Sequence, residues 1–123
     1  MDDKLKGVSH LIEAARCSLQ GLARAWHEEQ AFRQEAIVLG VLFLLLLLTE
    51  KSLGQMLLVI GGWFFVMSLE LLNSAVENAF NLIDREPNDR VKAGKDMASA
   101  AIFLAVAANV GLWLYIFFGC GAI

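Results

Sequence analysis

The sequence is poor in the features that mark a compact soluble domain or a disulfide framework. It has 1 proline and 2 cysteines in 123 residues, and 58% of its residues are hydrophobic, whereas soluble domains are usually about 45–50% apolar. Cys17 and Cys120 lie near opposite ends of the chain, and neither belongs to a CxxC pair or has metal-ligand spacing. Free cysteines usually behave as small apolar residues, so we read no disulfide or metal site from them.

Positive charge is too sparse for a nucleic-acid footprint. The 10 Lys and Arg are outnumbered by 13 Asp and Glu, which gives a net charge of −3, and we therefore expect no nucleic-acid partner. The length predicts one domain. The first apolar run begins after residue 35, behind a charged segment, and we therefore expect no cleavable signal peptide.

Familiar nucleotide-binding motifs are also missing. There is no GxGxxG in the chain. The segment "DRVKAGKD" (89–96) ends like a Walker A loop, but it lacks the first glycine and has Asp96 where a Ser or Thr should follow the lysine. No strand is expected before it. The sequence therefore excludes a P-loop and a site like that of protein kinases.

Residues 4–28 carry an amphipathic helical pattern. Apolar side chains recur at spacings of three and four, and Trp26 lies near the end of this stripe. Charged side chains occupy the other faces. Beside apolar spans, such a helix is typical of the headgroup layer of a membrane, and we expect a surface helix here.

The apolar excess is concentrated in blocks that predict three membrane spans. The uncharged run 36–49 would reach only about 21 Å as a helix, short of the roughly 30 Å hydrocarbon core, so it must take in residues before it, giving a span at about 31–49. The second span is expected over 53–83. The third is expected over 97–118, which is rich in small residues that allow close helix packing.

Between the last two spans, 84–96 holds the proline and many charges. We expect a polar loop there, with a turn at Pro87–Asn88. Five Lys and Arg lie in the N-terminal segment up to Arg33, one lies in 50–52 and four lie in 84–96. The positive-inside rule then places the N-terminus and the 84–96 loop in the cytoplasm, and the 50–52 turn and the C-terminus on the periplasmic side. The expected fold class is an all-α membrane protein.

The end of the second span carries unusual polar residues. Glu70, Asn73 and Glu77 are spaced i, i+3, i+7 and share one helix face, which Asn81 extends. A charge at the centre of a membrane helix costs about 2.5–3.5 kcal/mol on insertion scales, so such residues usually face a protein interior or a wet cavity. A solvated helix end is the alternative, and it suits Glu77 better than Glu70, which leucines flank.

The expected topology brings further polar groups, from 33–35 and 95–96, to the same cytoplasmic boundary. Carboxylates can hold Mg²⁺, which usually binds together with substrate phosphates. Lys95 can neutralise a transferring phosphoryl group, and a second carboxylate can take a proton from an alcohol. Phosphoryl transfer depends mainly on positioning and charge stabilisation, so this small set could suffice.

Four segments carry a family resemblance: "GLARAW" (21–26), "EQAFRQE" (29–35), "ELLNSAVE" (70–77) and "AGKDMASAA" (93–101). With them the chain resembles the small membrane-integral prokaryotic diacylglycerol kinases over nearly its whole length. The resemblance implies an ATP-dependent lipid kinase of the bacterial inner membrane. It also implies a homotrimer of three-span protomers, with active sites shared between neighbouring subunits at the cytoplasmic interface.

The resemblance assigns roles residue by residue. Glu70 resembles the catalytic base on the lipid hydroxyl, and Glu29 and Glu77 resemble the ligands of the Mg²⁺ that arrives with ATP. The groups around the phosphates would be Asn73, Glu77, Lys95 and Asp96. The groups on the lipid side would be Arg33, Glu35, Glu70 and Ser99.

Some positions depart from the better-known members. His10 stands where an Arg is familiar, Glu13 where a Lys is, Cys17 where a Tyr is, and Asn81 where an Asp is. By position His10, Cys17 and Asn81 would lie on the nucleotide side, so the departures concern the contacts to adenine and ribose. Taken alone, His10 is more typical of an ordinary surface histidine.

Two functions besides diacylglycerol phosphorylation stay open at this point. A related branch phosphorylates undecaprenol and tends to read "NTAIE" and "KD" followed by "AAGA", whereas this chain reads "NSAVE" and "KDMASAA". That difference favours diacylglycerol. A small proton or cation transporter subunit would also suit Glu70 and Glu77, but it leaves Lys95, Asp96 and the surface helix unexplained. A purely structural membrane protein is a further alternative, and it would tolerate Glu70→Leu.

Overall fold

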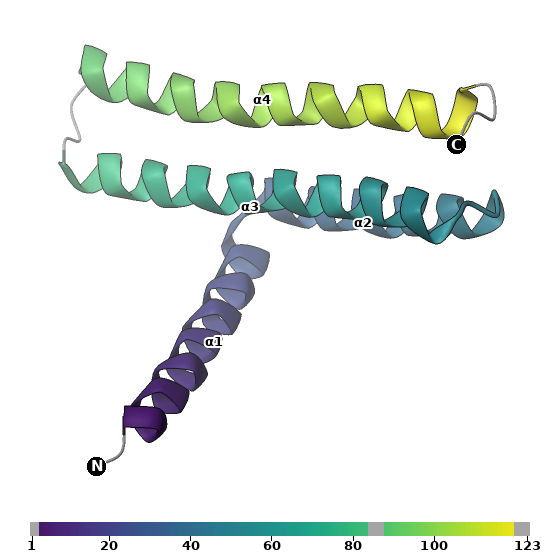
Figure 1. Ribbon diagram of the computed structural model, residues 1–123. Coiled ribbons are helices and arrows are strands. Elements are labelled where there is room, and N and C mark those ends of the chain that lie inside the picture. The colour runs from purple at the N-terminus through teal and green to yellow at the C-terminus, as the bar shows by residue number, and fades with distance from the viewer. Residues whose placement is uncertain (1–2, 84–87, 120–123) are drawn as a thin grey trace.

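Four helices make up the part of the chain that the computed structural model describes, residues 3–83 and 88–119. They are α1 (Asp3–Glu28), α2 (Gln30–Leu48), α3 (Leu53–Ile83) and α4 (Asp89–Phe118). Helix α3 packs against both α2 and α4, and α1 contacts α2. Figure 1 shows α2, α3 and α4 running alongside one another, while α1 leaves this bundle at a steep inclination.

A single extended residue separates α1 from α2. Glu29 has φ −110° and ψ 108°, which breaks the helix and lets the chain change direction. The guanidinium of Arg33 donates hydrogen bonds from Nη1 to the carbonyl oxygens of Trp26 (2.7 Å) and His27 (3.2 Å). The last carbonyls of a helix have no partner within it, so Arg33 closes the end of α1 and fixes how α1 leaves the bundle.

A capping box starts α3 after the short turn from α2. The backbone N–H of Ser52 donates to Gln55 Oε1 (3.0 Å), and the N–H of Gln55 donates to Ser52 Oγ (3.2 Å). This reciprocal pair satisfies two N–H groups that the helix itself leaves free. The ammonium of Lys51 lies 5.7 Å from the centre of the Phe117 ring, so the turn also contacts the last residues of α4.

The bundle is held by apolar packing in its middle. Leu46, Val59 and Val66 are fully buried. The indole rings of Trp63 and Trp113 lie 5.3 Å apart at 53° to each other, which joins α3 to α4. Gly62 belongs to the same contact, because a Cβ atom there would lie 2.6 Å from Asn109 Oδ1. The missing side chain lets the two helices come close.

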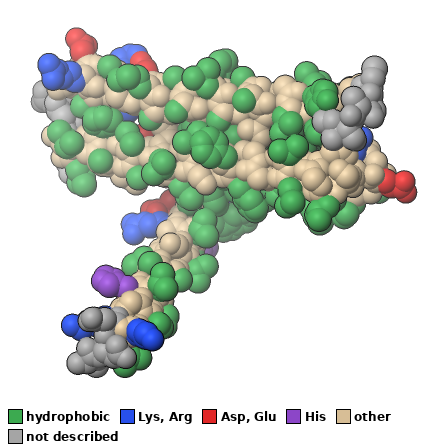
Figure 2. Space-filling model, viewed as in Figure 1, with side chains coloured by type: hydrophobic (Ala, Val, Ile, Leu, Met, Phe, Trp, Pro, Cys, Tyr) green, Lys and Arg blue, Asp and Glu red, His purple; other side chains and the backbone are tan. Residues whose placement is uncertain are grey.

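The outer surface of the bundle is apolar. Leu48 is 70% exposed, Phe65 60% and Phe103 72%, and Figure 2 shows hydrophobic side chains spread over the bundle. Helices α2, α3 and α4 are each long and apolar enough to cross a membrane. Apolar side chains that face outward over three such helices are suited to lipid rather than water. The prediction of an all-α membrane protein with three spans and an N-terminal amphipathic helix is confirmed.

The third span starts earlier than expected. We expected a polar loop over 84–96, but α4 begins at Asp89. Asn88 caps it, accepting hydrogen bonds at Oδ1 from the N–H groups of Arg90 (2.8 Å) and Val91 (3.5 Å). The charged residues over 89–96 are therefore part of the first turns of α4. Pro87, half of the predicted turn, lies outside the described residues, as does Cys120.

Candidate functional site

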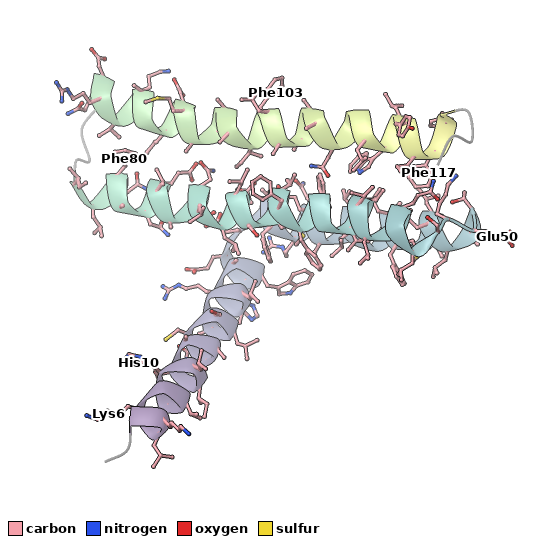
Figure 3. The ribbon with its side chains drawn as sticks, viewed as in Figure 1. Lys6, His10, Glu50, Phe80, Phe103 and Phe117 are labelled. Atoms are coloured by element: carbon pink, nitrogen blue, oxygen red, sulfur yellow. The ribbon has the colours of Figure 1, made fainter. Side chains whose placement is uncertain are left out.

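The candidate site occupies the last turns of α3 and the first turns of α4. In Figure 1 these two segments extend past the point where α1 joins α2. An added Cβ at Gly94 would collide with the Phe80 ring, so α4 approaches α3 closely there. Figure 3 shows Phe80 near this end of the pair. At this end Lys95 of α4 and Asn81 of α3 face one another.

Two carboxyl groups meet between α2 and α3. Glu70 is only 8% exposed, and its carboxyl group lies beside that of Glu35. Two neighbouring carboxyl groups can form a hydrogen bond only when one of them carries a proton, because an ionised carboxylate can only accept. Glu35 Oε1 is buried and has no hydrogen-bond partner among the described residues. Burial and pairing therefore distinguish Glu70 from a solvated carboxylate at a helix end.

The next turn of α3 holds an amide and a second acid. Asn73 Nδ2 donates to Glu77 Oε1 at 3.4 Å, a long and weak bond. Asn73 Oδ1 is buried without a protein partner, while Glu77 is exposed. The Glu77 carboxylate is therefore open to solvent and to ligands, and Asn73 lies between it and Glu70 along the helix.

The first turns of α4 bring cations to this face. Lys95 Nζ donates to Asn81 Oδ1 at 2.8 Å, which joins α4 to the end of α3. Asp96 instead accepts from Lys92 Nζ at 2.7 Å, one turn away on α4. Because its partner is a neutral amide, Lys95 keeps a positive charge that no carboxylate neutralises in this contact. Asp96 is engaged in an exposed ion pair that water and salt screen.

A groove runs between α1 and the next face of α3. It has a volume of about 480 Å³, and Glu29 and Glu28 line it from the α1 side, opposite Ser74 and Asn78. Glu28 is paired with Arg24 at 2.6 Å. Ser74 and Asn78 lie on the face of α3 adjacent to the one that carries Glu70 and Glu77. Glu29 thus faces a different side of α3 from the acids with which we grouped it.

The described chain does not bring all the predicted residues together. Glu35 meets Glu70, Asn73 meets Glu77 and Lys95 meets Asn81. Within residues 3–83 and 88–119, no three His, Cys, Asp or Glu side chains lie close enough to hold a metal ion. Ser99 is exposed on α4, and His10 and Cys17 are exposed on α1, which Figure 3 shows projecting away from the bundle.

One contact of the site escaped sequence reasoning. The indole N–H of Trp63 donates to the backbone oxygen of Glu35 at 2.7 Å. Trp63 lies within an uncharged run and gives no sign of a polar partner. Helical spacing is the one sequence signal that could have linked Trp63 to the site, because Trp63 and Glu70 are seven residues apart and share a face of α3.

Comparison with known proteins gives consistent matches. Residues 16–117 match the family described as prokaryotic diacylglycerol kinase. A diacylglycerol kinase of Haemophilus influenzae is 36% identical over 110 residues, covering 89% of this chain and 93% of that protein. The diacylglycerol kinase of Escherichia coli K12 is 33% identical, covering 92% of this chain and 93% of that protein. The diacylglycerol kinase of Helicobacter pylori J99 is 37% identical, covering 89% of this chain and 86% of that protein.

Proposed function

The chain belongs to the prokaryotic diacylglycerol kinase family, and we propose that it transfers the γ-phosphoryl group of ATP to the free hydroxyl of diacylglycerol, giving phosphatidic acid and ADP. The buried Glu70, which lies beside Glu35 at the end of the apolar bundle, carries this proposal. A lipid hydroxyl and a nucleotide phosphate can meet at this depth, where the membrane ends and the helix continues.

Glu70 is proposed as the general base. In its ionised form, the Glu70 carboxylate accepts the proton of the lipid hydroxyl. The hydroxyl oxygen then forms a bond to the γ-phosphorus, and the bond from that phosphorus to the bridging oxygen of ADP breaks. The electron pair leaves with ADP. Positioned proton transfer of this kind typically contributes about 10²–10⁴-fold to the rate.

Lys95 and Asn73 are proposed to hold the phosphates. The ammonium of Lys95 keeps its charge because its partner is the neutral Asn81, and it would offset the negative charge that develops on the transferring group. Asn73 would contribute its amide beside Glu77. Asp96 would join them on leaving its exposed pair with Lys92, which is weak enough to exchange.

The acids suit Mg²⁺. Proteins commonly bind this ion through one or two carboxylates together with substrate phosphates, and Glu77 and Glu29 both have carboxylates outside the buried core. We propose that these two hold it. When bound, the ion would neutralise part of the phosphate charge. Arg33 and Ser99, together with Glu35, would border the lipid.

A homotrimer would complete the site. Within one chain, Glu29 faces the α1–α3 groove, apart from Glu77, and His10 and Cys17 project away with α1. A neighbouring copy would supply the missing side, and it would also cover part of the exposed apolar surface. We propose that the N-terminus and the α3–α4 connection lie in the cytoplasm of a bacterial cell with the C-terminus periplasmic, because Lys and Arg concentrate on the first side.

Diacylglycerol is favoured over undecaprenol as the lipid. The relatives described above are named diacylglycerol kinases, and the segments "NSAVE" and "KDMASAA" point the same way. No described contact favours a transporter, whose acids would be expected nearer the middle of the bilayer. An ion-flux measurement in liposomes without ATP would detect that function.

The test compares two Glu→Gln variants in mixed micelles with Mg²⁺, ATP and diacylglycerol. Glu70→Gln removes the proposed base and should lower kcat by about 10³-fold, within the range for a lost general base. Glu50→Gln is the matched control, because Glu50 lies in the exposed turn at the opposite end of the bundle and should leave kcat unchanged. A Glu70→Gln protein with normal kcat would remove Glu70 as the base.

A further inference from the structure

Trp63 ties α3 to the backbone of Glu35. It is 5% exposed, and its indole N–H donates to the carbonyl oxygen of Glu35 at 2.7 Å. Within α2, that carbonyl can also accept a hydrogen bond from the backbone N–H four residues later in the helix. A second bond from another helix is therefore not needed to satisfy the carbonyl. What the bond adds is a fixed point between the two helices.

The same glutamate contacts α3 at a second point. Its side chain lies beside that of Glu70, which comes seven residues after Trp63 and on the same face of α3. Seven residues of helix span about 10.5 Å. Helix α3 thus holds Glu35 by its backbone at one point and by its carboxyl group two turns further on. A slide or rotation of α2 against α3 would disturb both contacts together.

The indole itself is held from the other side by α4. Trp113 lies 5.3 Å from it, ring centre to ring centre, at 53°. One turn earlier on α4, Asn109 packs against Gly62, the neighbour of Trp63. The ring of Trp63 therefore cannot turn away from Glu35 without moving α4. By contrast, the indole nitrogen of Trp113 is buried and has no hydrogen-bond partner in the part of the chain that the structure describes.

We propose that Trp63 is a positioning residue for the phosphoryl transfer: its N–H sets the register of α2 against α3 so that the Glu35 carboxyl group meets Glu70. Trp63 does not touch the reacting atoms in this account. The proposal rests on the proposed function for its kinetic consequences. The geometry that it describes, the pairing of two carboxyl groups, exists without substrate and can be measured without turnover.

The first test removes the donor and keeps a ring. Trp63→Phe should lower kcat about tenfold and leave the KM values for ATP and diacylglycerol within about twofold, because small misplacements of a catalytic group reduce kcat more than binding. Trp113→Phe is the matched control. It makes the same change at a neighbouring tryptophan whose N–H has no protein partner, and it should leave kcat within about twofold.

A second replacement covers the case in which Trp63→Phe loosens the fold. Replacing Trp63 with 3-benzothienylalanine keeps the size and shape of the ring and substitutes sulfur for the N–H. It should give the same tenfold loss in kcat. In a Glu35→Gln background the carboxyl pair is already altered. Trp63→Phe should therefore change the remaining rate by less than twofold, because both changes act on the Glu35–Glu70 pair.

An infrared spectrum of the substrate-free protein separates this inference from the proposed function. The carboxyl C=O band that disappears in Glu35→Gln should shift in the benzothienylalanine protein and stay in place in Trp113→Phe. A wild-type kcat and an unshifted band in the benzothienylalanine protein would overturn the positioning role. If the wild-type protein phosphorylates no lipid, the proposed function fails, and the band still decides whether Trp63 sets the carboxyl pair.

Discussion

The two halves of α3 differ sharply in what they contact. The half before Glu70 carries no charge, and its inward residues Val59, Trp63, Val66 and Met67 are buried between α2 and α4. The half from Glu70 onward forms polar contacts with α2 and α4, through Glu70 and Asn81. Packing of the apolar half holds α3 in place, and the side chains of the polar half are therefore held at fixed positions. One continuous helix thus joins a membrane anchor to a site.

The largest effect beyond Glu70 itself is expected from Lys95 in the polar half. Lys95→Met removes the charge that faces Asn81 and should lower kcat by about 10²-fold, or about 2.7 kcal/mol of barrier. Lys92→Met is the control: it breaks an exposed ion pair with Asp96 and should change kcat by less than about threefold. Equal losses in the two variants would mean that charge near the membrane surface matters, not the position of Lys95.

The apolar half should be sensitive to volume instead of charge. Gly62→Ala places a Cβ atom against Asn109 Oδ1, at 2.6 Å, and should lower the free energy of unfolding by about 1–3 kcal/mol. Gly61→Ala is the control, because nothing lies within 4 Å of its added Cβ. It should be neutral or stabilising, since Ala favours helix over Gly by about 1 kcal/mol.

A double variant checks the cause of that loss. Asn109→Ala removes the side chain that obstructs the new methyl group, so Gly62→Ala should cost clearly less in its presence. Unfolding in detergent, followed by tryptophan fluorescence, measures all four proteins. If the cost of Gly62→Ala is the same with and without Asn109, the close approach of α3 and α4 at this point is not what the glycine provides.

The smallest effect is expected at the start of the apolar half. Ser52→Ala removes the hydroxyl that caps α3 and should lower the free energy of unfolding by about 1 kcal/mol. Ser68→Ala serves as the control, because Ser68 Oγ donates to the carbonyl of Phe64 within the helix and caps nothing. A thermal shift of equal size in both variants would argue against the capping box.

The sequence predicted the apolar half better than the polar half, and the reason is physical. A long uncharged run is stable mainly as a membrane helix. The three spans and the fold class could therefore be predicted from these runs. The predicted start of the third span is too late, because a dense set of charges such as that over 89–96 is typical of a polar loop. The Asn88 cap and the Lys92–Asp96 pair, both visible in the sequence, are what extend the helix there.

The partners within the site could not be predicted from the chain alone. That Glu70 shares a face with Asn73 and Glu77 follows from helical spacing. That Glu35 is the residue which meets Glu70 depends on how α2 is rotated and shifted against α3, and the Trp63 bond that accompanies it lies in a run with no polar pattern. In the proposed homotrimer, residues on α1 would depend further on a neighbouring copy, which no spacing within one chain can specify.

The most direct test of the central claim is a side-by-side assay of the purified wild-type protein with Mg²⁺ and labelled ATP, using diacylglycerol in one set of micelles and undecaprenol in the other. We expect labelled phosphatidic acid from the first and a much slower reaction, or none, from the second. Transfer to undecaprenol at a higher kcat/KM would contradict the proposed substrate, and the absence of transfer to either lipid would contradict the proposed function.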